Sequence, residues 1–130
     1  YTAIDKIAPV IERLKSTYPQ ATFYAGNIPP LSVFQDNQFD TLVSFQVIEH
    51  IQDDHLFLKE IHRILKPGGQ ALLTTPNRVM SLSRNPWHVR EYTAPELTEL
   101  ARRYFPVVAM KGIGGNEKVM AYYCLLYTSD

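Results

Sequence analysis

Strand-like and helix-like segments alternate along this chain, and this alternation limits the available folds more than any other feature. Helical spacing of apolar residues fills most of the intervals between the strand-like runs. Parallel strands need a crossover of this kind, because neighbouring strands that run in one direction cannot be joined by a tight turn. We therefore predict an α/β fold with a mostly parallel sheet and flanking helices. The predicted strands cover residues 1–4, 21–25, 39–45 and 70–75, the third as a buried type.

Local signals mark the ends of the predicted helices. The first helix follows Asp5 and carries Pro9 in its first turn, where proline is tolerated. The second takes Asp53 as its N-cap and ends at Lys66-Pro67-Gly68-Gly69. A third begins at Thr93-Ala94-Pro95-Glu96, which is a capping box. We also predict a strand at 107–110 and a helix at 117–123.

Composition and charge exclude several classes of protein. Thirteen basic and thirteen acidic side chains cancel, so no net field attracts nucleic acid or an anionic membrane. No apolar run approaches the roughly 20 residues that span a bilayer, and nothing resembles a signal peptide. The single cysteine, Cys124, forms no internal disulfide. We expect a cytoplasmic protein with no membrane span and no nucleic-acid partner.

Polar residues follow the ends of successive predicted strands. Asp5, Asn27 and Gln46 come after the first three strands, and Pro76-Asn77 follows the fourth. In an open parallel sheet, ligands bind outside the carboxyl ends of the strands. Asp5 suits two ribose hydroxyls, since a carboxylate offers two acceptor oxygens, but it also suits a helix cap. Asn27 suits an adenine edge or a plain turn. Asp5 does not show whether the ligand is an adenosine cofactor or a dinucleotide, because both present a ribose at this position.

Two histidines are candidates for acid–base chemistry. Glu49-His50 follows the third strand at the same edge, and histidine accepts a proton near neutral pH because its unperturbed pKa is about 6.5. A helix-capping or packing pair is the alternative. His88 lies beside Trp87 in the long loop 76–92, which is either a substrate lid or a surface loop with an anchoring tryptophan.

The spacing of the histidines predicts no metal site. His55 and His62 lie seven residues apart on one predicted helix, without the tight spacing of metal ligands. Glu49, His50 and His88 could bind a divalent ion only if the fold brought them together. The prediction from sequence is therefore that no metal is bound.

Two blocks carry a family resemblance. Phe39–Ile51 resembles the fourth-strand motif of class I S-adenosylmethionine-dependent methyltransferases. Leu65–Gly69, followed by Thr74–Asn77, resembles the motif around their fifth strand, and the spacing of the blocks also fits. Together they resemble a group that includes ubiquinone-pathway O-methyltransferases, over roughly residues 1–123. The resemblance implies a Rossmann-like fold and S-adenosylmethionine as cofactor.

The resemblance also implies residue roles. Asp5 would hold the cofactor ribose, Asn27 the adenine amino group, and Ile28 would pack on the ring. Asn27 replaces the usual acid, and Lys6 stands where the family commonly has an apolar residue. The implied cofactor-binding residues are Asp5, Lys6, Asn27, Ile28, Phe45 and Gln46; those facing the acceptor substrate are Glu49, His50, His88 and Tyr92, with His50 and His88 as candidate catalytic bases.

Compared with the family, the chain looks cut at both ends. The family's first strand, with its glycine-rich loop, has no counterpart, and the last strand is not expected either. We interpret residues 1–123 as a partial methyltransferase domain. Residues 124–130 resemble a translated sequencing adaptor and are expected to be a non-native tail. The family's first strand lies between its second and fourth, so we expect the 130-residue chain alone neither to fold stably nor to bind cofactor.

Three functions remain open at this stage. The resemblance implies methyl transfer from S-adenosylmethionine to a small-molecule acceptor in the parent protein. A nicotinamide-dependent Rossmann dehydrogenase shares the alternating pattern and the acid after a strand, although the two motif blocks disfavour it. A catalytically silent methyltransferase-like binding module is the other alternative, because Asn27 and Lys6 depart from the family pattern. The sequence identifies neither the acceptor nor an oligomeric state.

Overall fold

The computed structural model describes residues 1–81 and 85–114. Its element order alternates strands and helices, as predicted. The described elements are β1 (Thr2–Asp5), α1 (Ala8–Thr17), β2 (Thr22–Ala25), β3 (Phe39–Phe45), the 3₁₀ turn η1 (Ile48–His50), α2 (Asp54–Ile64), β4 (Leu65–Thr74), the 3₁₀ turn η2 (Arg78–Met80) and α3 (Ala94–Arg102).

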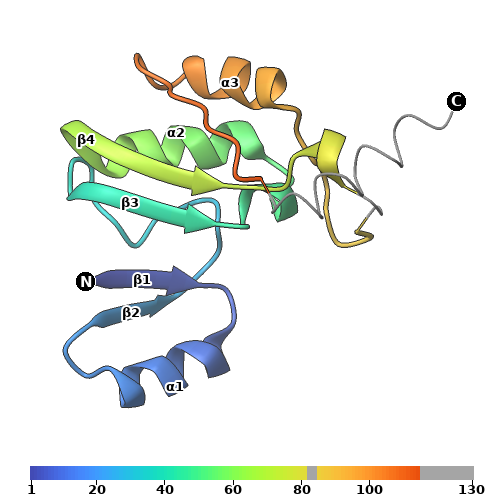
Figure 1. Ribbon diagram of the computed structural model, residues 1–130. Coiled ribbons are helices and arrows are strands. Elements are labelled where there is room, and N and C mark those ends of the chain that lie inside the picture. Colours follow the sequence, from blue (N-terminus) through green and yellow to red (C-terminus); the bar gives the residue numbers. More distant parts are fainter. Residues whose placement is uncertain (82–84, 115–130) are drawn as a thin grey trace, which may run out of the picture.

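The strands form two parallel pairs. β1 pairs with β2 from Thr2↔Thr22 to Asp5↔Ala25. β3 pairs with β4, and the two pairs are separate two-stranded sheets within the described residues. In Figure 1, α1 packs beside β1 and β2, while α2 and α3 lie on the other side, above β3 and β4. The parallel direction of both pairs confirms the predicted α/β class.

Among the described residues, helix α2 supplies four of the ten buried residues of the main hydrophobic cluster. The Asp53 side chain accepts a hydrogen bond from the Leu56 backbone N–H at 2.8 Å, which confirms the predicted N-cap. Phe57, Ile61 and Ile64 are buried in the main hydrophobic cluster, as their helical spacing predicts. Burial of one such side chain contributes about 1.5–3 kcal/mol, so this stripe holds α2 against its sheet.

The other two helices are less buried. In α1, Pro9 lies in the first turn as predicted, and Ile11 is the buried residue. Helix α3 begins with the predicted capping box. Thr93 accepts from the backbone N–H of Glu96, and the Glu96 carboxylate accepts from the backbone N–H of Thr93. Leu100 is the residue through which α3 enters the core.

The start of β4 differs from the prediction. The strand begins at Leu65, directly after α2, instead of at Gln70. Its register jumps from Phe39↔Leu65 to Thr41↔Gln70, so the segment between is an irregularity inside the ladder. Gly68 has φ +78°, a left-handed conformation that glycine adopts without steric cost. The glycine turn was recognised, but the ladder resumes on both sides of it.

A second expectation about strands was wrong. The chain is not a strand at 107–110, where Val107 is 85% exposed. An extended segment becomes a strand only when a partner takes its hydrogen bonds, and local sequence does not reveal that partner. The helix predicted at 117–123 and the tail 124–130 lie outside the described residues.

The prediction that β3 is a buried-type strand was wrong, because only one of its faces is covered in the described part of the chain. Leu42 packs against the core cluster beneath α2. On the opposite face, Val43 and Phe45 are more than half exposed, as is Leu72 on β4. Within the described residues, therefore, only one face of this sheet is covered.

In the described part of the chain, no helix has the length and apolar character that crossing a membrane requires.

Candidate cofactor and acceptor site

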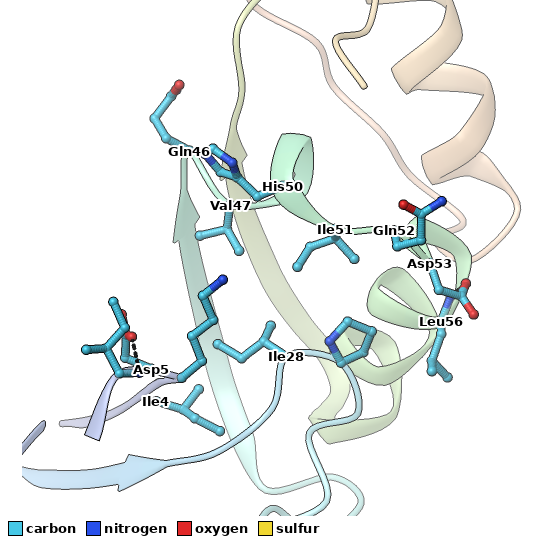
Figure 2. Close-up of a pocket in the computed structure, with 13 residues that line it drawn as sticks. Ile4, Asp5, Ile28, Gln46, Val47, His50, Ile51, Gln52, Asp53 and Leu56 are labelled. Carbon is cyan, nitrogen blue, oxygen red and sulfur yellow. Dashed lines mark hydrogen bonds between the residues drawn. The ribbon is translucent and has the colours of Figure 1, made fainter. Parts of the chain in front are cut away.

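A cavity of about 610 Å³ lies at the carboxyl ends of β1 and β3. This is the edge where ligands bind in open parallel sheets. In Figure 2, Ile4 and Asp5 approach from the end of β1, and Gln46, Val47 and His50 from the end of β3 and the turn after it. The remaining residues that line it are Lys6, Ile7, Ile28, Pro29, Ile51, Gln52, Asp53 and Leu56.

Asp5 has a role in the local fold and also lines the cavity. It is the last residue of β1, and its Oδ1 accepts a hydrogen bond from the Ile7 backbone N–H at 2.8 Å. This bond orders the chain just before α1. Because a carboxylate has a second oxygen with further acceptor sites, Asp5 also presents hydrogen-bonding capacity to the cavity that it lines.

Gln46 directly follows β3 and has an unusual backbone conformation. Its φ is +55°, in the left-handed region that L-residues other than glycine rarely adopt. Its backbone N–H donates to the Thr74 carbonyl at 2.9 Å, and its side-chain amide to the Thr74 hydroxyl at 3.3 Å. These bonds to β4 hold the strained turn in place. The turn directs the chain from β3 into the cavity wall that contains Val47 and His50.

The cavity brings together four of the six residues with predicted cofactor roles. These are Asp5, Lys6, Ile28 and Gln46. Asn27 is exposed after β2, and Phe45 is 57% exposed; neither lines the cavity. The rule that ligands meet at strand ends therefore selected the edge at which the cavity lies, but did not determine which neighbouring side chains line it.

Glu49, His50 and His88 meet although 38 residues separate the last two. One potential ligand atom from each lies within 4.8 Å of the others. The rings of His50 and His88 are 4.9 Å apart between centroids, edge to face. His50 lines the large cavity, and His88 lines a second cavity of about 350 Å³. The fold therefore brings the three side chains together, which the spacing of the residues in the sequence could not establish.

Hydrogen bonds hold the segment 85–92, here called the His88 loop, against η1. The Glu49 carbonyl accepts from the backbone N–H of Val89 at 2.8 Å and of Arg90 at 3.3 Å. His50 Nδ1 lies 2.9 Å from the carbonyl of Trp87. Since a carbonyl only accepts, Nδ1 carries the proton and donates it, which leaves the lone pair of the neutral ring on Nε2.

Tyr92 occupies a structural position and not the acceptor-facing one expected. It is buried, lines neither cavity, and donates its hydroxyl proton to Asp54 Oδ2 at 2.7 Å. Arg90 donates to the same oxygen at 2.7 Å. Burial, and then the hydrogen bond to Asp54, raise the pKa of Tyr92 well above its ordinary value.

The sequence analysis missed three residues that set the geometry of this cluster. Glu91 Oε1 lies 2.6 Å from His88 Nδ1, Asn85 Nδ2 lies 3.0 Å from His88 Nε2, and Thr75 donates to Glu49 Oε2 at 2.9 Å. A signal existed for each of them. Asn85 and Glu91 each lie three residues from His88, and Thr75 belongs to the second motif block.

Parallel strand pairs, flanking helices and a cavity at the strand ends define a Rossmann-like α/β domain. The chain belongs to the methyltransferase domain family, whose model matches residues 1–73, more than half of its length. The resemblance to S-adenosylmethionine-dependent methyltransferases that the two motif blocks carry is thereby confirmed.

Relatives extend the likeness beyond residue 73. A protein of Mycolicibacterium smegmatis, named as a probable S-adenosylmethionine-dependent methyltransferase, is 40% identical over 102 residues, 75% of this chain and 39% of the relative. A ubiquinone biosynthesis O-methyltransferase of Pseudomonas aeruginosa is 42% identical, but over 41 residues only, 32% of this chain and 18% of the relative. The ubiquinone-pathway likeness is thus local.

A solved structure supports the fold. The 1,6-didemethyltoxoflavin N1-methyltransferase of Burkholderia thailandensis, determined with 1,6-didemethyltoxoflavin and S-adenosylhomocysteine bound, matches with a TM-score of 0.63 and 24% identity. The match covers 79% of this chain and 48% of that one. The chain spans less than two fifths of the length of its relatives, 39% of the Mycolicibacterium smegmatis protein and 37% of a probable S-adenosylmethionine-dependent methyltransferase of Mycobacterium tuberculosis.

Proposed function

We propose that the protein transfers a methyl group from S-adenosylmethionine to a small-molecule acceptor. The observation that carries this proposal is the cavity at the ends of β1 and β3, where Asp5, Ile28 and Gln46 meet beside His50. Membership of the methyltransferase domain family adds independent support. The names of the Mycolicibacterium relative and of the Burkholderia neighbour point to the same cofactor.

The residues that line the cavity fit this cofactor. Its volume of about 610 Å³ suits a ligand of this size, since small-molecule sites commonly enclose about 300–1,000 Å³. Asp5 would accept hydrogen bonds from the ribose hydroxyls, and Ile4 and Ile28 would cover the adenine ring. Bound S-adenosylmethionine supplies a methyl group on a sulfonium, which is already a good leaving group. Positioning by these residues would therefore account for much of the rate.

His50 is our candidate for removal of the acceptor's proton. It lines the cavity, and its hydrogen bond to the Trp87 carbonyl leaves Nε2 as the basic nitrogen of the neutral ring. A base of this kind is needed only when the acceptor must lose a proton. His88, whose ring stands beside that of His50, is the second candidate.

Cofactor binding is tested by removing the negative charge of Asp5 while keeping the residue's shape. The experiment uses the complete reading frame that contains this chain. In Asp5→Asn the amide oxygen still accepts from Ile7, so the local fold is retained, but the charge-assisted bonds to ribose are lost. We expect S-adenosylmethionine affinity to fall by about tenfold, equivalent to about 1.4 kcal/mol, as measured by isothermal titration calorimetry.

Asp40→Asn is the matched control, because Asp40 is exposed on β3 and lines neither cavity. If the Asp5 and Asp40 variants bind S-adenosylmethionine with equal affinity, Asp5 does not contribute to the binding site. Absence of S-adenosylmethionine binding by the unaltered protein would contradict the proposal itself.

Turnover distinguishes an enzyme from a silent binding module. The unaltered protein should release S-adenosylhomocysteine when it is incubated with S-adenosylmethionine and a panel of small hydroxyl- and amine-bearing acceptors. If the protein binds S-adenosylmethionine in the calorimeter but releases no S-adenosylhomocysteine with any acceptor, the silent binding module is favoured.

A further inference from the structure

From the cluster of Glu49, His50 and His88 we infer a binding site for one divalent transition-metal cation of the zinc type. Two imidazoles and one carboxylate form a set that binds zinc or ferrous iron in open sites. Their potential ligand atoms lie within 4.8 Å of one another. Because ligands about 2.1 Å from a tetrahedral cation are about 3.4 Å apart, side-chain adjustments of about an ångström would close the set.

The Glu49 carboxylate is buried, and one of its two oxygens has no hydrogen-bond partner within the described residues. The residue is 0% exposed, and within the described residues Oε1 has no hydrogen-bond partner. Oε2 accepts from the Thr75 hydroxyl, and Arg90, the nearby cation in the chain, is paired with Asp54. A buried carboxylate with an unsatisfied oxygen is costly unless a charge or donor compensates it. A bound cation would supply that compensation.

Each histidine makes through Nδ1 the kind of hydrogen bond that metal-bound histidines usually make. A metal-bound imidazole commonly donates its other ring N–H to a carbonyl or carboxylate, which fixes the tautomer. His50 Nδ1 donates to the Trp87 carbonyl at 2.9 Å, and His88 Nδ1 to the Glu91 carboxylate at 2.6 Å. In both rings Nε2 keeps its lone pair. Asn85 Nδ2, which lies 3.0 Å from His88 Nε2, would be displaced on binding.

The same atoms explain why the cation should be a transition metal. Magnesium and calcium prefer oxygen ligands, whereas two of the three ligands here are imidazoles. With a cation bound, the histidine lone pairs are ligands and no longer bases. An acceptor hydroxyl that reached the cation's open position would then lose its proton more readily, because a bound divalent cation lowers the pKa of a coordinated oxygen.

Direct titration tests the site without relying on turnover. The protein encoded by the complete reading frame that contains this chain is treated with a chelator to remove bound metal. It is then titrated calorimetrically with zinc and with magnesium. Cobalt is added separately, and its visible spectrum reports coordination number and nitrogen ligation. We expect one zinc per chain, much weaker binding of magnesium, and a low-coordinate cobalt spectrum. Binding of less than one zinc per chain, or equal affinity for the two ions, would overturn the inference.

Variants establish whether the cation binds at these residues. Glu49→Gln keeps the acceptor for Thr75, and His88→Ala removes one imidazole; each should weaken zinc binding at least 100-fold. Glu91→Gln should weaken it by about 10–100-fold, as expected for a group that orients a ligand. His62→Ala on α2 is the matched control, because His62 is exposed and outside the cluster. Circular dichroism verifies that each variant is folded.

The results can be read independently of the methyl-transfer proposal. Unchanged zinc affinity in folded Glu49→Gln and His88→Ala would place the cation elsewhere and overturn the inference, while leaving His50 as a free base. Loss of zinc affinity confined to the cluster variants would support the site, even if no acceptor were found.

Discussion

At the scale of single residues, the carboxylate of Asp54 connects α2 to the loop that carries His88. Asp54 is buried at the start of α2 and accepts from both Tyr92 and Arg90 through one oxygen. The Arg90 guanidinium also lies 6.0 Å from the centre of the Tyr92 ring. The backbone of the same loop donates to the Glu49 carbonyl. Asp54 therefore helps to hold the His88 loop near η1.

This arrangement predicts a loss of stability at alkaline pH. The pKa of folded Tyr92 is raised above its ordinary value of about 10. The contribution of Tyr92 is therefore complete below pH 10, and is lost as pH rises towards the folded pKa, because the unfolded state loses its proton first. Relative to Tyr92→Phe, the unaltered protein should lose up to about 1.4 kcal/mol per pH unit above pH 10.

Urea unfolding of the protein encoded by the complete reading frame that contains this chain, between pH 8 and 11, measures this effect, with Tyr18→Phe as the control because Tyr18 is half exposed. At neutral pH, Tyr92→Phe should cost about 1–3 kcal/mol, because the buried Asp54 loses a donor. Parallel pH profiles for the unaltered protein and Tyr92→Phe would contradict the assigned role of Tyr92.

The candidate site was predictable at residue scale only where topology decides it. Asp5 is the last residue of β1 and Gln46 directly follows β3, so their place at the edge with the cavity follows from parallel order alone. The approach of His88 to His50 depends on hydrogen bonds between the loop and the Glu49 carbonyl, which no local pattern encodes. For the same reason the buried position of Tyr92 could not be read from its place in a polar loop.

At the scale of elements, α3 depends on its capping box. The pKa of Glu96 is lowered because the carboxylate accepts from the Thr93 backbone N–H and hydroxyl and from Arg78. Thr93→Ala removes the hydroxyl that accepts from the Glu96 backbone N–H. We expect a loss of about 1 kcal/mol, typical of an N-cap, measured by urea unfolding at neutral pH.

Thr98→Ala is the matched control within α3. The Thr98 hydroxyl donates to the Ala94 carbonyl, which the helix backbone already uses, so its removal should change stability by under about 0.5 kcal/mol. Equal losses for the two threonine variants would show that general packing of α3, and not its cap, determines the effect.

Element boundaries were predictable where the signal is local. β3 has the predicted bounds and β2 begins one residue later than predicted, because short apolar runs end at turn residues. The cap of α2 was correct because an N-cap acts on its own first turn. The predicted start of β4 was wrong because a strand ladder can accommodate a glycine turn and continue on both sides of it. The predicted strand at 107–110 was wrong because pairing requires a distant partner.

At the scale of the whole molecule, the two strand pairs meet around a cavity without sharing a ladder. β1 and β3 both contribute to the cavity of about 610 Å³, yet within the described residues each is hydrogen-bonded to one neighbour only. Val43, Phe45 and Leu72 leave apolar surface on the bare face of the β3–β4 sheet. Unpaired strand edges and exposed apolar surface both reduce the free energy of unfolding.

These features predict that the 130-residue chain alone is unstable. Two-stranded sheets are marginally stable in water, and here the pairs do not extend one another's ladders. We expect scanning calorimetry of the isolated chain to show no cooperative transition, and titration to show no micromolar S-adenosylmethionine binding. The complete reading frame that contains it should show both. A cooperative transition with micromolar binding by the isolated chain would mean that packing of α2 and α1 on their sheets suffices to hold β1 and β3 around the cavity.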